Sequence, residues 1–249
     1  MKLDRVIAVR NLKTVYRDGD RCVKVFGKGY KKQDVFSEAL NQAKAEETGL
    51  NVPKVLEVSM IEGKWVIVTE YIKGKSLAQL MKENPDETDQ YTELLVDLQL
   101  QVQSKSCPFL YKLKDKLKSK IVLADLDEDT RSALLAQIES MDGQNLLCHG
   151  DFIPSNIIIR DDGTPFILDW SHMTTGDAAA DFAMTYLLFL MNEDKDGADR
   201  YLNLLCQKIN ISEQQIKKWV PVVAASQSIK GNIQKREFML AQVNLSDFS

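Results

Sequence analysis

The chain has 249 residues, of which 44% are hydrophobic and 27% are charged, and its formal net charge is −4. A chain of this size buries a sizeable core, and this composition predicts an ordinary soluble globular protein with no sign of disorder. The mild acidity and the lack of a dominant basic tract argue against a nucleic-acid-binding protein. The sequence has no apolar stretch long enough for a membrane helix and no apolar leader at its start, so we expect a cytoplasmic protein.

Residues 1–72 are expected to form a small, strand-rich part with one helix. β-branched and apolar runs predict strands over residues 6–9, 14–16, 22–26, 55–58 and 65–72. Residues 33–47 predict a helix, whose apolar stripe we assign to Phe36, Leu40 and Ala43. Lys24 lies between Val23 and Val25, so its side chain should point to the opposite face of the strand. A solvated lysine is the alternative reading of that position.

Residues 73–249 are expected to form a larger, mainly helical part, which gives an α+β fold overall. Helical patterns cover residues 88–103, 110–123, 129–140 and 177–191. Another helix should begin after Ser212, and Pro221 should kink it. Asp181 lies within the nearly apolar 177–191 segment and needs a partner, because an unpaired buried carboxylate is costly.

A β-hairpin is predicted around the turn sequence Asp161-Asp162-Gly163-Thr164, which separates two apolar runs. With Asp162-Gly163 as a two-residue loop, Arg160 faces Pro165 and Asn156 faces Asp169, unless a bulge shifts the register. Facing residues have Cβ atoms roughly 5 Å apart, so an amide oxygen and a carboxylate can share one hard cation. Asn156 and Asp169 are therefore the predicted Mg²⁺ ligands. Because Pro165 donates no hydrogen bond, we expect an edge ribbon.

Asp151 lies five residues before Asn156, in the loop that leads into this hairpin. A carboxylate there can accept the proton of an attacking hydroxyl, so Asp151 is the predicted catalytic base. His149 is a second candidate. We expect it to be a packed, hydrogen-bonded support, because the neighbouring carboxylate already fits the role of base.

The run from His149 to Asn156, followed by Ile167-Leu168-Asp169-Trp170, resembles the signature of the aminoglycoside phosphotransferase and choline kinase family. The resemblance implies the bilobal protein-kinase-like fold, with a nucleotide-binding lobe over residues 1–72 and a catalytic, acceptor-binding lobe over residues 73–249. It also implies Mg²⁺ as cofactor and ATP or GTP as phosphate donor.

The same resemblance assigns further roles. Lys24 would hold the nucleotide phosphates, and Glu38, fifteen residues before Pro53, would pair with it, with Glu46 and Glu47 as other candidates on the helix. The backbone of Glu70 and Ile72 would bind adenine. Residues 10–14 would cover the phosphates without a glycine, which leaves Lys13 and Thr14 as side-chain donors. Asp181 would bind backbone amides of the catalytic loop, and Gln99 and Gln103 stand where family members often carry histidines.

We therefore expect an Mg²⁺-dependent kinase that phosphorylates a hydroxyl of a small molecule, such as an aminoglycoside or an amino alcohol. A protein kinase is disfavoured, because only twelve positions separate Asp169 from Asp181 and no Ala-Pro-Glu motif lies between them. A catalytically silent nucleotide-binding module is the remaining alternative. The sequence names neither the acceptor, for which a cationic amine is one candidate, nor the oligomeric state.

Overall fold

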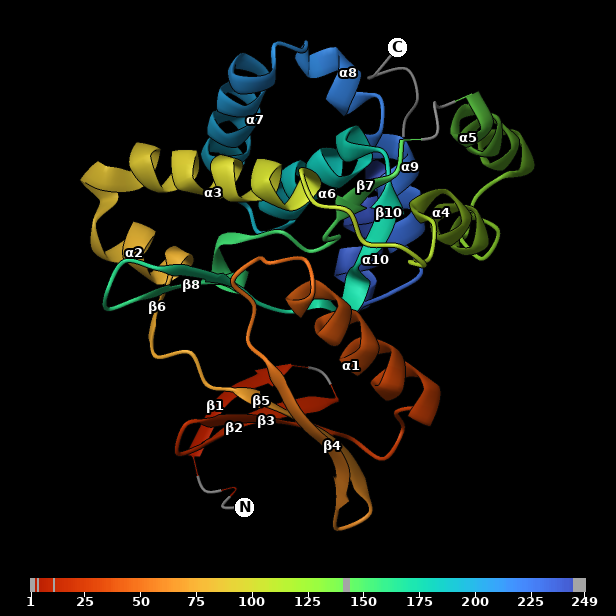
Figure 1. Ribbon diagram of the computed structural model, residues 1–249. Coiled ribbons are helices and arrows are strands. Elements are labelled where there is room, and N and C mark those ends of the chain that lie inside the picture. Colours follow the sequence, from red (N-terminus) through yellow and green to blue (C-terminus); the bar gives the residue numbers. More distant parts are fainter. Residues whose placement is uncertain (1–2, 4, 11, 141–143, 244–249) are drawn as a thin grey trace. The chain divides into compact units, whose positions relative to one another are not determined.

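The computed structural model describes residues 3, 5–10, 12–140 and 144–243 and contains both helices and sheets (Figure 1). The chain divides into two compact units. The first comprises residues 1–83 and 154–172, and the second comprises residues 84–153 and 173–249. The division at residue 72 refers to the lobes of a kinase-like domain and stays a prediction.

The first unit is built on a five-stranded antiparallel sheet in the order β1-β2-β3-β5-β4. In chain order the strands are β1 (Arg5–Arg10), β2 (Lys13–Asp18), β3 (Arg21–Phe26), β4 (Val55–Ile61) and β5 (Lys64–Glu70). Helix α1 (Lys32–Glu46) contacts β4 and β5 (Figure 1). The predicted strands and helix are confirmed, with ends that differ by a few residues.

The two faces of this sheet bury different side chains. One face buries the valines Val23, Val25, Val66 and Val68. On the other face, Phe26 and Ile67 pack with Val35 and Ala39 of α1. Because side chains alternate along a strand, Lys24 lies on the α1 face, as its flanking valines predicted.

The buried face of α1 differs from the predicted apolar stripe. Phe36 and Leu40 are 46% and 55% exposed, whereas the helix buries Val35, Glu38, Ala39, Gln42 and Ala45. The prediction was wrong because it assigned the largest apolar residues to the buried face. It did not consider that polar residues can be buried when they have hydrogen-bond or ion-pair partners. Gln42 Nε2 donates to the Pro53 carbonyl at 2.7 Å, and Glu38 forms ion pairs.

The predicted hairpin belongs to a second sheet of the first unit, with strand order β6-β8-β9. These strands are β6 (Gly74–Ser76), β8 (Ile157–Arg160) and β9 (Pro165–Ile167). The hairpin lies at one edge of this sheet, as expected, because β9 is the outer strand and β6 pairs with the other side of β8. Pro165 lies on the edge strand β9, which its missing N–H requires. Helix α2 (Leu77–Glu83) follows β6 and contacts it.

The register of β8 and β9 is one residue away from the prediction, because Ile159 and not Arg160 faces Pro165. The loop has three residues: the Arg160 amide donates to the Thr164 carbonyl at 3.0 Å, and the Gly163 amide donates to the Arg160 carbonyl at 2.9 Å. The predicted two-residue turn needs a positive φ at Asp162 as well as at Gly163, yet of these two only Gly163 has one (φ 83°).

As a consequence, Asn156 lies beside Leu168 and not opposite Asp169. The Leu168 amide donates to the Asn156 carbonyl at 2.8 Å, just beyond the last strand pair. The predicted strand pairing of Asn156 with Asp169 is therefore wrong by one residue. The backbone of the two residues remains close, because Asp169 follows Leu168 directly.

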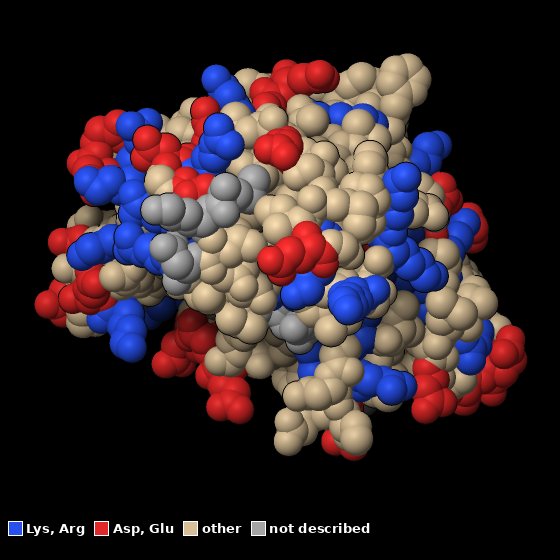
Figure 2. Space-filling view, turned by 90° about the horizontal axis from the view of Figure 1, so that it is seen from below, with Lys and Arg blue, Asp and Glu red and all other residues tan. Residues whose placement is uncertain are grey.

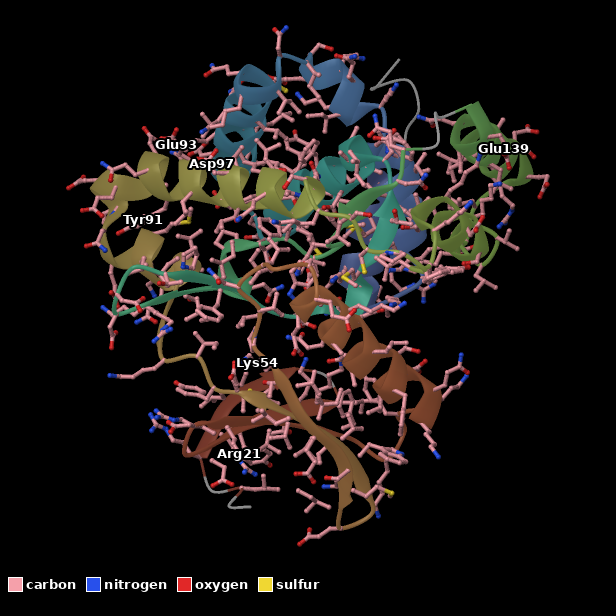
Figure 3. All side chains as sticks on the ribbon, viewed as in Figure 1. Arg21, Lys54, Tyr91, Glu93, Asp97 and Glu139 are labelled. Atoms are coloured by element: carbon pink, nitrogen blue, oxygen red, sulfur yellow. The ribbon has the colours of Figure 1, made fainter. Side chains whose placement is uncertain are left out.

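The second unit is mainly helical. Its helices are α3 (Thr88–Gln103), α4 (Leu113–Ile121), α5 (Glu128–Ser140), α6 (Ala178–Met191), α7 (Lys195–Ile209), α8 (Glu213–Lys217), α9 (Val220–Gln227) and α10 (Ile233–Ala241). Strands β7 (Leu146–Cys148) and β10 (Thr174–Gly176) form a small antiparallel pair. Lys208 on α7 bridges Glu93 and Asp97 on α3 at 2.9 and 2.7 Å, which joins these helices at the surface (Figure 3).

The prediction that Pro221 kinks a helix is wrong. Ser212 caps α8 through a capping box with Gln215, as expected, but α8 ends at Lys217 and Pro221 lies in the first turn of the separate helix α9. Proline is accepted there because the first helical N–H groups have no intrahelical partner. Trp219, between the two helices, is buried.

No helix in the described part of the chain is both long and apolar enough to cross a membrane. On the face shown in Figure 2, basic and acidic side chains are interspersed over the surface.

Candidate active site

Glu38 lies at the centre of a polar cluster in the first unit. Lys24 Nζ is 2.5 Å from Glu38 Oε1, and Lys13 Nζ is 2.6 Å from Oε2. The alternative acid Glu46 is engaged elsewhere, because its Oε1 accepts the Val55 amide at 2.7 Å. Glu38 is therefore the acid of α1 that pairs with Lys24.

Lys13 is held from two sides. Besides Glu38, its ammonium group lies 5.2 and 5.3 Å from the ring centres of Phe26 and Tyr30, within the range of cation–π attraction. Thr14 is the next residue of β2 and pairs with Val25. Asn11, in the middle of the predicted phosphate loop, lies outside the described residues.

Asp169 joins this cluster from the hairpin, with Oδ1 3.7 Å from Lys24 Nζ. Its backbone is left-handed (φ 60°), a conformation that Asp tolerates better than most residues. The chain then enters a short 3₁₀ helix, Trp170–His172, where Asn41 of α1 donates to the Ser171 carbonyl at 3.4 Å. Trp170 is fully buried and donates to the Ile167 carbonyl at 3.0 Å. The backbone is therefore anchored on the C-terminal side of Asp169.

Asp169 and Lys24 keep their charges at neutral pH. Burial alone would raise the pKa of Asp169, but the ammonium groups of Lys24 and Lys13 hold that pKa well below its usual value. Burial alone would lower the pKa of Lys24, but Asp169 and Glu38 raise it above its usual value. Opposite charges at short range favour the ionised forms of both partners.

Asp169 and Asn156 have the chemistry of Mg²⁺ ligands. Asp169 Oδ1 is buried and accepts no hydrogen bond from the part of the chain that the structure describes. Such an ionised oxygen suits a hard divalent cation, which prefers oxygen ligands. Asn156 is 3% exposed, and its backbone carbonyl accepts a hydrogen bond from the amide of Leu168, the residue before Asp169.

Glu70, the residue predicted to contact adenine, ends β5. Its amide donates to the Lys54 carbonyl at 2.9 Å, and its carboxylate accepts the Lys54 amide at 3.2 Å. Arg21 on β3 is its register partner (Figure 3). The Tyr71 amide donates to the Asp20 carbonyl at 2.8 Å, and Ile72 follows in an irregular segment. The backbone leading to Ile72 is thus held at two successive residues.

In the second unit, β7 leads directly into the predicted catalytic loop. Gly150 has a left-handed backbone (φ 78°), which a side chain would strain. Asp151 is half-buried, and its amide donates to His149 Nδ1 at 3.2 Å. His149 is fully buried and its ring packs edge-on against Phe152, with ring centres 5.4 Å apart.

Asp181 on α6 contacts this loop. Its Oδ1 accepts the Gly150 amide at 2.7 Å, and its Oδ2 accepts the His149 amide at 3.2 Å. The side chain is 2% exposed. The backbone contacts that the resemblance implied for Asp181 are therefore present, and they satisfy a buried carboxylate.

The candidate residues fall into two groups, each within one unit. The first unit holds Lys13, Thr14, Lys24, Glu38, Glu70, Ile72, Asn156 and Asp169, and the second holds His149, Asp151 and Asp181. Sequence reasoning missed the Lys13–Glu38 pair and a contact between Gln99 and Asp181. A signal for the second existed, because Gln99 is a polar residue next to the apolar stripe of its helix.

Residues 7–214 match the model of the phosphotransferase enzyme family. The chain belongs to this family. Among curated proteins, the LicA protein of Haemophilus influenzae strain Rd is 27% identical over 186 residues, which cover 70% of this chain and 66% of that protein. A second LicA protein of the same species is matched over 52% of its length. The chain thus spans only about half to two thirds of these relatives.

Several solved structures share the fold of this chain. A thermostable mutant of aminoglycoside phosphotransferase APH(4)-Ia superposes with a TM-score of 0.72 at 13% identity, over 96% of this chain and 92% of that one. Choline kinase LicA from Streptococcus pneumoniae gives 0.63 at 15% identity, over 97% and 93%. A choline/ethanolamine kinase family protein from Mesorhizobium loti gives 0.66 at 17% identity, over 100% and 90%. These structures confirm the predicted α+β, protein-kinase-like fold.

Proposed function

We propose that this member of the phosphotransferase family transfers the γ-phosphoryl group of ATP to a hydroxyl group of a small molecule. The observation that carries the proposal is the charged cluster of Lys24, Glu38 and Asp169, which joins β3, α1 and the hairpin. A partly buried set of two acids and a lysine is costly to build, and phosphoryl transfer is a chemistry that needs it. The structure of the APH(4)-Ia mutant with AMP-PNP and hygromycin B supports a nucleotide as donor.

On the nucleotide side, Lys24 holds the phosphates and Glu38 fixes its ammonium group. Lys13 and Thr14 add donors near the phosphates, while the backbone of Glu70 and Ile72 binds the adenine edge. Asn156 and Asp169 are the residues that would hold Mg²⁺, which when bound neutralises charge on the phosphate oxygens. GTP is an alternative donor, since backbone contacts at Glu70 and Ile72 do not by themselves select adenine.

On the acceptor side, Asp151 orients the hydroxyl group and accepts its proton. The hydroxyl oxygen forms a bond to the γ-phosphorus while the bond from that phosphorus to the ADP oxygen breaks. His149 and Asp181 hold the loop that carries Asp151, through the His149 Nδ1 contact and the two loop amides.

The solved relatives support a proposal for the class of acceptor. APH(4)-Ia is crystallised with hygromycin B, and LicA of Streptococcus pneumoniae is a choline kinase. An aminoglycoside or an amino alcohol is therefore the acceptor class that we propose here. A protein substrate is disfavoured, since the twelve positions from Asp169 to Asp181 leave no room for a long activation segment.

A screen of ATP consumption over aminoglycosides, amino alcohols, sugars and nucleosides tests the proposal. Asp151→Asn should lower turnover of the best acceptor by about 100-fold or more, with Mg-ATP binding retained, because the proton acceptor is lost. Asp161→Asn is a matched control, since Asp161 is an exposed acid of the hairpin loop paired with Lys73. Mg-ATP binding without turnover of any acceptor would favour the silent module, and full activity of Asp151→Asn would refute the role of Asp151.

A further inference from the structure

A buried polar network lies behind the catalytic loop within the second unit. It joins Gln99 of α3, Thr185 and Asp181 of α6 and Tyr201 of α7, each at most 2% exposed. Gln99 Nε2 donates to Asp181 Oδ2 at 3.3 Å and to Thr185 Oγ1 at 3.1 Å, and Tyr201 OH donates to Gln99 Oε1 at 2.6 Å. Three helices thus meet at one amide group.

The orientation of this amide follows from the chemistry of its neighbours. An ionised carboxylate can only accept hydrogen bonds, so the group of Gln99 that faces Asp181 must be the NH₂. The amide oxygen then faces Tyr201, whose hydroxyl must donate. Burial raises the pKa of Tyr201 well above its usual value, which keeps that hydroxyl protonated.

We propose that Gln99, oriented by Tyr201, is a positioning residue that fixes how Asp181 presents its two oxygens to the amides of the catalytic loop. This inference rests on the proposed function, because the loop carries the catalytic base. Asp181 Oδ2 receives both the Gln99 amide and the His149 amide, so the first contact sets the rotation of the carboxylate for the second. The path runs from Tyr201 through Gln99 and Asp181 to the backbone one residue before Asp151.

Gln99 suits this task because its side chain does not titrate. A neutral donor supplies the same hydrogen bond at any pH at which the protein is folded, whereas an acid or an imidazole in its place would gain or lose a proton. The loop geometry should therefore be independent of pH in the range where Asp151 is ionised. If the amide of Gln99 only filled space in the core, its replacement would not be expected to change kcat.

Two substitutions test the positioning role, with one matched control. Gln99→Leu and Tyr201→Phe should lower kcat about 10- to 100-fold, with KM for Mg-ATP within about twofold, because they misalign the loop and not the nucleotide. Gln103→Leu should keep kcat within about twofold. Gln103 is buried one turn further along α3, and its Nε2 has no hydrogen-bond partner in the described structure. Equal kcat values for Gln99→Leu and Gln103→Leu would overturn the inference.

The variant Gln99→Glu gives a readout that loss of stability cannot imitate. The new carboxyl group can donate to Asp181 when it is protonated, as the amide does, whereas two ionised carboxylates repel each other. Relative to the wild type, the kcat of this variant should recover about tenfold as the pH falls from 8 to 6. A ratio that stays constant over this range would contradict the role of the donor.

Hydrogen exchange tests the same contact without any acceptor. In Gln99→Leu, but not in Gln103→Leu, the His149 and Gly150 amides should exchange at least about tenfold faster, because they lose a fixed acceptor. Unchanged exchange would overturn the inference even in an active kinase. Faster exchange in a protein that phosphorylates nothing would support the loop contact and refute only the proposed function.

Discussion

At the scale of single residues, one carboxylate, that of Glu38, pairs with two lysines. Glu38 presents one oxygen to Lys24 and the other to Lys13, and its side chain is 9% exposed. The shared acid fixes two ammonium groups near each other that would otherwise repel. This arrangement concentrates positive charge where the triphosphate is proposed to bind.

Lys24→Met should raise KM for Mg-ATP about tenfold or more and lower kcat/KM about 100-fold, because it removes the positive charge that is proposed to hold the phosphates. The fold should be retained, since Glu38 keeps Lys13 as its partner. Steady-state kinetics measures both parameters. Lys73→Met, at an exposed lysine, is the control, and equal kinetics for the two variants would contradict the role of Lys24.

Asp169 makes stability depend on pH. Its pKa is lowered in the folded state, so its charge stabilises the fold above the ordinary carboxyl pKa of about 3.9, and this contribution is lost as the pH falls further. The wild type should therefore exceed Asp169→Asn in free energy of unfolding by about 1–2 kcal/mol at pH 7. That difference should shrink between about pH 5 and pH 2. Urea denaturation of both proteins measures it, and a difference that is constant over pH would refute the assignment.

At the scale of elements, local patterns predicted most helices and strands but not every contact between them. The ends of α3 coincide with the predicted 88–103, because its polar and apolar residues alternate with helical period. The α1 stripe was wrong, since Glu38 and Gln42 are buried by partners on other elements that no helical pattern reveals. Short strands such as β6, which depend on pairing with a distant strand, were missed for the same reason.

The candidate site was predictable to a similar degree. The family resemblance pointed to Lys24 and Glu38, and the hairpin pattern pointed to Asp169. The structure brings these three residues together. The hairpin register failed by one residue, because the choice between a two-residue and a three-residue loop depends on the backbone of Asp162. The register prediction also assumed an extended backbone at Asp169, whereas this residue is left-handed (φ 60°).

Helix α4 carries lysines on opposite faces with different environments. Lys114 and Lys118 pair with Glu139 of α5 (Figure 3). Burial lowers the pKa of Lys116 to about 8 and that of Lys120 to about 7, and Lys230 adds repulsion to both. Between pH 7 and the usual lysine pKa of about 10.4, the unfolded chain binds more protons at Lys120 than the folded chain does. The free energy of unfolding should therefore rise with pH over this range.

Lys120→Gln should therefore stabilise the protein by about 1 kcal/mol at pH 7 and flatten the rise in stability up to pH 9.5. Lys118→Gln, which removes an ion pair of the same helix, should show no stabilisation. Urea denaturation at the two pH values compares them. A Lys120→Gln protein that is less stable than the wild type at pH 7 would refute this reading of α4.

At the scale of the whole molecule, nucleotide binding should depend on the divalent cation. With Mg-ATP at 100 times its Kd, the free energy of unfolding should rise by about 2.7 kcal/mol. ATP with EDTA should give a much smaller shift, because Asp169 then faces the phosphates without a bridging cation. A thermal-shift series measures both, and equal shifts with and without Mg²⁺ would contradict the proposed metal ligands.

The first unit consists of two stretches of chain, 1–83 and 154–172, with residues 84–153 made in between. During translation, Lys24 and Glu38 therefore leave the ribosome long before Asp169 does. At typical elongation rates the delay is on the order of ten seconds, which is long compared with the formation of a helix or hairpin. Until then the sheet lacks the Asp169 carboxylate that pairs with Lys24. A nascent fragment that ends before residue 154 should therefore not complete the first unit.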